Sequence, residues 1–93
     1  MNSYNDGNMA TGKELALLSQ KKLAVGAKQL RKALHNGKAS QVFLARNADP
    51  AITEPLLALC QHKSVAFAWV KSMTDLGQAC GIEVGAAAAA IVA

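Results

Sequence analysis

The chain has 93 residues, the length of one domain with a single modest core, and a net charge of +4. Hydrophobic residues make up 52% of it but aromatic residues only 4%, so burial must come mainly from Leu, Val, Ile and Ala. The apolar segment over residues 86–93 is far shorter than the roughly 20 residues of a membrane-spanning helix, and the first residues lack the apolar core of a signal peptide, so we expect a cytoplasmic protein without a membrane partner.

Residues 1–12 are polar, rich in Asn and Gly, and without periodicity, which predicts a flexible tail before a single domain over residues 13–93. Within that domain, apolar spacing predicts helices over residues 13–21, 27–37, 48–63 and 72–81. Short β-branched, aromatic or alanine-rich segments predict strands over residues 23–25, 41–47, 65–70 and 86–92. Because helices and strands alternate, we expect an α/β fold, a three-layer α/β/α sandwich around a small mixed four-stranded sheet. The alanine-rich last strand is expected to be central and fully buried.

Positive charge is concentrated in the first half of the predicted domain. Between Leu15 and Ala48 there is no acid, and there are seven cations: Lys21, Lys22, Lys28, Arg31, Lys32, Lys38 and Arg46. From Asp49 to Ala93 there are four acids and two lysines. This distribution is typical of nucleic-acid binding, although an ordinary solvated lysine face would give the same pattern.

The sequence contains no recognisable catalytic or metal-binding motif. His35 and His62 have no acid or cysteine at ligand spacing, there is no Walker loop, and no serine has the G-x-S-x-G context of a nucleophile. Cys60 and Cys80 form no C-x-x-C pair, which indicates two thiols in a reduced compartment and not a disulfide or a metal site. We therefore expect no enzymatic activity, no catalytic residues, no metal and no cofactor.

The segment GAKQLRK, residues 26–32, combines a glycine with the start of an amphipathic helix. Gly26 lets a partner approach the backbone closely, and the helix that follows offers N–H groups to a phosphate. Lys28, Gln29 and Lys32 fall on one side of this helix, where their ammonium and amide groups can reach base edges. A solvated helix face would have the same composition, so both interpretations are open at this point.

The segment LGQACGIEVG, residues 76–85, places Glu83 between Ile82 and Val84 and flanks them with glycines. A buried strand would exclude the charge, and a loop in solvent would not need the two aliphatic side chains. We therefore expect a loop tip that presses against a partner. The simpler alternative is a solvated loop acid.

Three segments, taken in this order and at this spacing, resemble the kink-turn-binding ribosomal proteins: VGAKQLRKAL, FLARNADP and MTDLGQACGIEVG. This is the superfamily of L-seven-Ae and L-thirty-e, and the likeness is greatest to its short bacterial YbxF type. It extends from about Lys13 to Val92. The LGxACGIEV motif is specific, and the G-x-K-Q-x-x-K motif is less so. The resemblance implies an α/β/α sandwich that binds the kink-turn, an RNA helix bent sharply at a three-nucleotide bulge beside tandem sheared G·A pairs.

The resemblance also implies which residues of the predicted helix contact RNA. Gly26, Lys28, Gln29 and Lys32 match the residues that enter the opened major groove at the G·A pairs. Arg31 adds positive charge that would release counterions from the RNA.

A second RNA contact is implied for the loop of Ile82, Glu83 and Val84, which matches the loop that covers the flipped-out bulge nucleotide. Ile82 and Val84 would pack on base faces, while Glu83 or its backbone would accept hydrogen bonds from base or sugar donors. Arg46, at the end of a predicted strand, is expected to face backbone phosphate.

The chain departs from the family pattern at a few positions. Lys28-Gln29 stands where archaeal members have Asn-Glu, and Ala27 replaces a frequent Thr, so the affinity or the tolerance of the G·A sequence is expected to differ. The sequence does not specify the RNA, which could be ribosomal RNA, a riboswitch or the RNA of a ribonucleoprotein. We expect a ribosome-associated protein, and nothing in the sequence indicates more than a monomer.

A protein-interaction or assembly module is the alternative hypothesis. In that case the loop of residues 82–84 would be a hydrophobic anchor for a protein partner. Affinity for that partner would be insensitive to RNase and to changes at Lys28 and Gln29.

Overall fold

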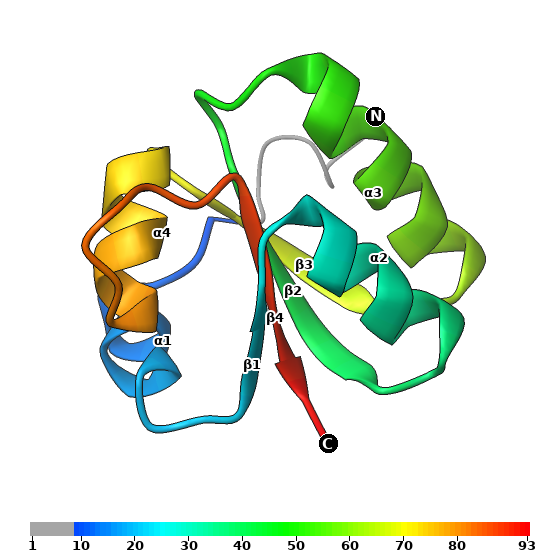
Figure 1. Cartoon of the computed structure of the whole chain (residues 1–93), viewed down its shortest axis with the longest axis horizontal. Helices are drawn as coiled ribbons and strands as arrows, with labels where there is room; N and C mark the ends of the chain where they lie inside the picture. The colour runs from blue at the N-terminus through cyan, green and yellow to red at the C-terminus, as the bar shows by residue number, and fades with distance from the viewer. Residues whose placement is uncertain (1–8) are drawn as a thin grey trace.

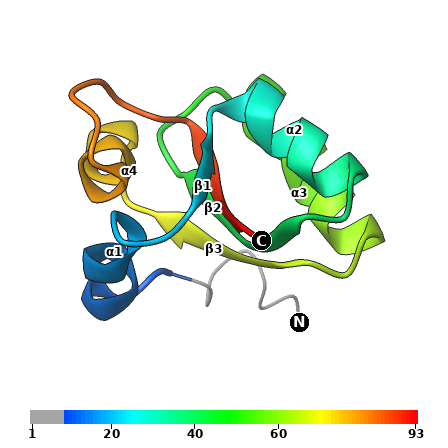
Figure 2. The same cartoon turned by 60° about the horizontal axis from the view of Figure 1, so that its bottom comes forward.

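The computed structural model describes residues 9–93, in which four helices alternate with four strands. In chain order the elements are α1 (Gly12–Leu18), β1 (Leu23–Val25), α2 (Ala27–His35), β2 (Ala39–Ala45), α3 (Pro50–His62), β3 (Ala66–Val70), α4 (Met73–Cys80) and β4 (Ala88–Val92). Helices α1 and α4 cover one face of the sheet, and α2 and α3 cover the other (Figures 1 and 2). The expected three-layer α/β/α sandwich is therefore confirmed. No helix within residues 9–93 is both long and apolar enough to cross a membrane.

The sheet is mixed, as expected, and has the strand order β1-β4-β2-β3. β2 and β3 run parallel, whereas β4 pairs antiparallel with both β1 and β2. The register aligns Val25, Ala89 and Phe43 across the three neighbouring strands. Ala88, Ala89 and Ala90 are fully buried, because β4 lies in the middle of the sheet between two helical layers.

Alternating side chains of β2 divide the core between the two faces of the sheet. Phe43 packs with Leu18 and Leu76 on the face covered by α1 and α4. Val42 packs with Leu30 on the face covered by α2 and α3. Each face of the sheet therefore has its own core, which packs against its own pair of helices. Because α2 and α4 both pack on the same sheet, their positions relative to each other are fixed.

The ends of α1 show why sequence spacing alone misplaces helix boundaries. The Thr11 hydroxyl accepts a hydrogen bond from the Glu14 N–H at 3.1 Å, and the Glu14 carboxylate accepts one from the Thr11 N–H at 2.8 Å. This reciprocal cap starts the helix at Gly12. The helix ends at Leu18 and not at Lys21, because the Lys21 N–H bonds to the carbonyl three residues before it.

The first described residues belong to the folded domain. Met9 forms a parallel bridge with Trp69 of β3, and the Ala10 N–H donates to the Trp69 carbonyl at 2.8 Å. These residues satisfy backbone groups of an edge strand, so residues 9–12 are not the flexible tail that the sequence predicted. The rest of that tail, residues 1–8, lies outside the described residues.

Four connections between elements meet at one end of the sheet, which we call the loop end. The Gly26 N–H donates to the Ala88 carbonyl at 2.8 Å, which joins the start of α2 to the start of β4. The Arg46 N–H donates to the Val70 carbonyl at 2.8 Å, which joins the ends of the parallel strands. The turns after β1, β2 and β3 and the loop before β4 therefore lie together, and both segments singled out from the sequence lie beside them.

Candidate nucleic-acid interface

Helix α2 begins at Gly26, whose φ of 97° and ψ of 154° fall in a region that strains other residues. A Cβ at Gly26 would meet no atom within 4 Å, so the backbone conformation, and not a lack of space, requires glycine here. No described side chain caps the helix start. The N–H groups of Lys28 and Gln29 in the first turn are therefore available to an acceptor from outside.

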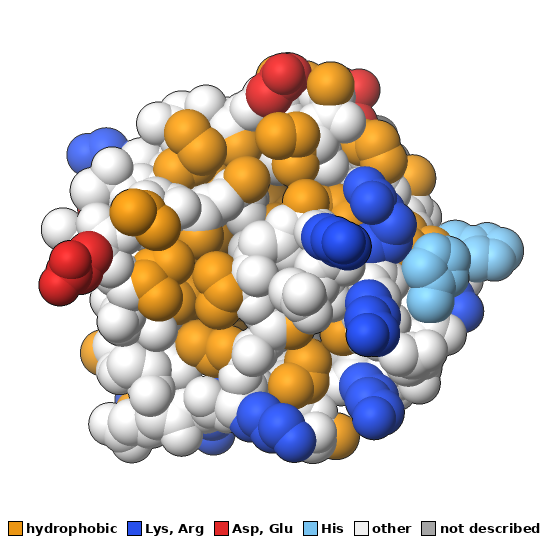
Figure 3. All heavy atoms as spheres, in the orientation of Figure 1, with side chains coloured by type: hydrophobic (Ala, Val, Ile, Leu, Met, Phe, Trp, Pro, Cys, Tyr) orange, Lys and Arg blue, Asp and Glu red, His pale blue; other side chains and the backbone are white. Residues whose placement is uncertain are grey.

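The outer face of α2 carries the polar residues that the sequence predicted. Lys28, Gln29 and Lys32 are exposed, as is Arg31, whereas Leu30 is buried against the sheet. Lys28 and Lys32 are one helical turn apart and so lie on the same side. Figure 3 shows Lys and Arg side chains gathered over α2 and the segments beside it. The structure therefore brings this part of the predicted site together on one surface.

The loop from α4 to β4 lies directly on α4 because two glycines allow it to approach. A Cβ at Gly77 would overlap the carbonyl oxygen of Val84, and a Cβ at Gly85 would stand 3.1 Å from the Cβ of Met73. The helix ends at Cys80 and is capped by Gly81, whose φ of 82° is left-handed. Sequence reasoning did not assign Gly77 and Gly85 a role, although Gly77, Gly81 and Gly85 recur every four residues.

The side chains of this loop divide between the core and the solvent. Ile82 is half-buried and packs against the cluster that contains Phe43 and Leu76. Glu83 is exposed, and Val84 is 71% exposed. Of the two aliphatic residues predicted to meet a base, Val84 is open to solvent, while Ile82 also anchors the loop to the domain.

The loop that carries residues 82–84 ends beside the start of α2, at the loop end. The Ala86 N–H donates to the Met73 carbonyl at 3.0 Å, so the chain returns along α4 before it reaches Ala88 beside Gly26. Basic side chains cover the α2 half of this face, and hydrophobic side chains gather over the α4 half (Figure 3). The surface can therefore contact a charged backbone on one side and an apolar ring face on the other.

Two further residues lie at the loop end with contacts that the sequence did not show. The Arg46 guanidinium stands 5.4 Å from the ring centroid of Trp69, and its Nε donates to the sulfur of Met9 at 3.2 Å. Arg46 therefore lies over β3, at the edge of the sheet opposite β1, and its contact with phosphate stays a prediction. Asn47 was missed: its side-chain oxygen accepts from the Met73 N–H at 2.8 Å and fixes the start of α4 beside this turn.

Neither cysteine has the properties of a reactive group or a metal ligand. Cys60 is buried, Cys80 is half-buried, and neither is in a disulfide. Burial raises the pKa of the Cys60 thiol to about 11 and also raises the pKa of Cys80, so both stay protonated at neutral pH. Within residues 9–93, no group of three or more His, Cys, Asp or Glu could hold a metal ion.

The fold and this surface define a small α/β/α domain with a basic helix next to a glycine-seated loop. Residues 9–93 match the ribosomal protein L7Ae/L30e/S12e/Gadd45 family, and the chain belongs to that family. The resemblance read from the sequence motifs is thereby confirmed.

Similar proteins carry names that refer to RNA. An RNA-binding protein of Bacillus pumilus is 47% identical over 70 residues, which cover 75% of this chain and 85% of the relative. RNA-binding protein YbxF of Geobacillus stearothermophilus is 42% identical over 76 residues, which cover 82% of this chain and 93% of the relative. Among solved structures, the Giardia lamblia 15.5kD RNA binding protein has a TM-score of 0.80 and 27% identity, over 100% of this chain and 84% of that chain.

Proposed function

We propose that this protein binds RNA without catalysing a reaction, and that it recognises and stabilises kink-turns, in which a bulge is flanked by sheared G·A pairs. The observation that carries the proposal is the exposed face of Lys28, Gln29 and Lys32 on a helix whose start is uncapped. Membership of the L7Ae family and the names of the relatives support it. We propose further that the protein is a cytoplasmic, ribosome-associated monomer.

The kink is what makes the RNA readable to such a helix. The major groove of regular A-form RNA is too deep and narrow for side chains to read bases. A sharp bend opens the groove at the G·A pairs, and α2 then enters with Gly26 closest to the RNA. The Gln29 amide offers both donors and an acceptor to a base edge, whereas Lys28 and Lys32 offer donors to guanine O6 and N7 or to phosphate.

The loop of residues 82–84 gives the second contact in this proposal. Val84, which is 71% exposed, covers the face of an unstacked base, with Ile82 behind it. Glu83 accepts hydrogen bonds from base or sugar donors, and its negative charge disfavours a plain phosphate at this point. The two contacts exist together only on the kinked RNA, so binding shifts the RNA population from extended to kinked forms.

The test compares a short kink-turn RNA with the same RNA in which both G·A pairs are replaced by Watson–Crick pairs. We expect tight binding to the first RNA and weak, strongly salt-dependent binding to the second. Equal affinity for both would reduce the α2 face to a generic basic patch and would overturn kink-turn recognition.

The exposure of Val84 also suits a protein partner, which is the second candidate function. A protein-assembly module would keep its partner after RNase treatment and after Lys28→Ala or Gln29→Ala. Loss of the partner in any of these cases would exclude this alternative and leave RNA as the ligand.

A further inference from the structure

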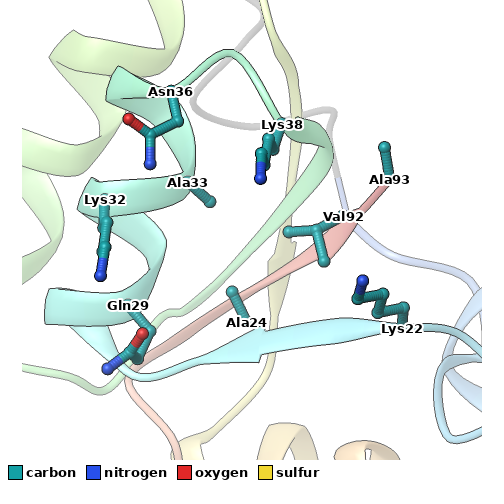
Figure 4. A pocket seen from close by; sticks show the side chains of 9 residues that line it. All are labelled: Lys22, Ala24, Gln29, Lys32, Ala33, Asn36, Lys38, Val92 and Ala93. Carbon is teal, nitrogen blue, oxygen red and sulfur yellow. The ribbon is translucent and has the colours of Figure 1, made fainter.

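A groove of about 240 Å³ runs along α2. It lies between this helix, the start of β1 and the C-terminal end of β4. It starts at Gln29 and Lys32, which belong to the proposed RNA-binding face, and continues away from the loop end to Lys22 and Lys38. The groove is therefore a continuation of that face and not a separate pocket. Figure 4 shows the side chains of its lining residues around it.

Three lysines from separate segments surround the groove. Lys22 precedes β1, Lys32 lies in α2, and Lys38 precedes β2. Gln29 and Asn36 add amide groups, and no acidic residue lines the groove. Within residues 9–93, none of the three lysines has an acidic partner. Three lysine side chains and no acidic side chain line the groove, so its field is positive.

The two outer lysines are held by backbone hydrogen bonds to the same strand. The Lys22 carbonyl accepts from the Val92 N–H at 2.9 Å, and the Lys38 carbonyl accepts from the Ala93 N–H at 3.1 Å. The Lys38 N–H also donates to the Ala33 carbonyl at 2.9 Å, which ties this residue to the end of α2. The Cα positions of both lysines are thus fixed by the sheet, and only their side chains adjust to a ligand.

The small residues that line the groove also allow a ligand to approach its floor closely. Between the lysines, its lining includes the small residues Ala24, Ala33, Val92 and Ala93. No aromatic residue, the usual anchor of a protein partner, lines it. A lysine ammonium group binds phosphate as a point charge, without the fixed two-pronged geometry of an arginine guanidinium. Three lysines around a groove are therefore suited to phosphate.

We propose that this groove binds the phosphate backbone of an RNA stem that extends beyond the kink. The inference rests on the proposed RNA binding and extends its footprint: Lys22 and Lys38 contact nucleotides further along the stem than those read by Gln29. Helix α2 has nine residues, so its far end lies about 13 Å from its start at a rise of 1.5 Å per residue. A stem cut short next to the G·A pairs does not reach Lys22 and Lys38.

The experiment uses a minimal kink-turn RNA and two longer versions, in which one stem or the other is extended. The full chain is compared with Lys22→Gln/Lys38→Gln, which removes two charges from the groove. The matched control, Lys13→Gln/Lys63→Gln, removes two exposed charges that do not line it. Circular dichroism and thermal melting are used to check that all three proteins fold, which we expect for changes at exposed positions.

We expect the wild type and the groove variant to bind the minimal RNA equally. With one of the extended stems, the wild type binds more tightly, whereas the groove variant gains nothing. On that RNA, a fourfold rise in salt weakens the wild type about tenfold more than the groove variant, since two phosphate contacts are lost. The control variant follows the wild type on every RNA.

A groove variant that follows the wild type in affinity and salt dependence on all three RNAs would overturn this inference. Failure of kink-turn recognition has a different signature, because the wild type would then bind the G·A and Watson–Crick RNAs alike. In that case the comparison of salt dependence on the two extended RNAs still decides whether the groove holds phosphate. No binding to any of the RNAs would overturn both proposals.

Discussion

The carbonyl oxygen of Val84 lies against Gly77, on the surface of α4, so closely that a Cβ at Gly77 would overlap it. The position of the 82–84 loop is therefore set by the absence of one side chain in the helix beneath it. A contact surface built in this way is sensitive to residues that never meet the ligand.

Gly77→Ala is expected to displace the loop and lower the free energy of unfolding by about 1–3 kcal/mol, the usual effect of overpacking. Affinity for kink-turn RNA should fall as well, because Val84 moves with the loop. Gly12→Ala in α1 is the matched control, since a Cβ there meets no atom within 4 Å. Urea unfolding and RNA titration measure both effects, and wild-type stability of Gly77→Ala would contradict the described packing.

Gln29→Ala is expected to weaken binding to kink-turn RNA by about 1–3 kcal/mol, the value of a bidentate base contact. Its binding to the Watson–Crick control RNA should not change. Gln61→Ala, at an exposed glutamine of α3, provides the comparison and should leave both affinities unchanged. A loss of a few tenths of a kcal/mol for Gln29→Ala would remove this residue from base recognition.

Alanine substitutions at Val84 and at Ile82 should have different effects on RNA affinity and on the free energy of unfolding. Val84→Ala removes exposed methyl groups, so the free energy of unfolding changes by less than about 0.5 kcal/mol. Its affinity for kink-turn RNA falls by about 1–2 kcal/mol, because two methyl groups no longer cover a base. Ile82→Ala instead costs about 1–2 kcal/mol of stability, since Ile82 packs against the core. Wild-type RNA affinity of Val84→Ala would show that the loop tip does not touch RNA.

Cys60 should make the folded state sensitive to alkaline pH. Burial raises its pKa from 9.0 to about 11, so the folded protein disfavours the thiolate relative to the unfolded chain. The stabilising contribution of the neutral thiol to the free energy of unfolding is complete below pH 9 and is lost as the pH rises from 9 towards 11. At about 1.4 kcal/mol per pKa unit, the loss amounts to roughly 2–3 kcal/mol. The measurement is urea unfolding of the wild type and Cys60→Ala from pH 8 to 11. A constant difference between the two proteins over this range would exclude the effect.

The layer architecture could be predicted from the sequence because it depends on local alternation. Eight segments with helical or strand spacing are enough to place helices on both faces of a sheet, and the alanines of residues 88–90 indicated a central strand. The end of α1 could not be predicted in the same way. It depends on whether the Lys21 N–H bonds to a carbonyl three or four residues earlier, and apolar spacing does not report this choice.

The candidate site was predictable where its residues are close in sequence. Lys28, Gln29 and Lys32 share a face because of helical geometry alone. The half-burial of Ile82 follows from the return of the loop along α4, and the position of Arg46 follows from Trp69 in a neighbouring strand. These contacts join residues that are distant in sequence, so no local sequence pattern predicts them.

Trp69 belongs to β3, which has β2 on one side and forms the edge of the sheet on the other. Met9 and Ala10 cover part of that edge through the bridge and the hydrogen bond to Trp69. The sequence of β3, AFAWV, is uncharged and strongly β-forming, and such edges pair readily with other chains. The short segment before α1 therefore reduces the unpaired edge that β3 exposes. Removing Met9 and Ala10 should leave α2 and the 82–84 loop in place and yet produce a protein that self-associates at high concentration.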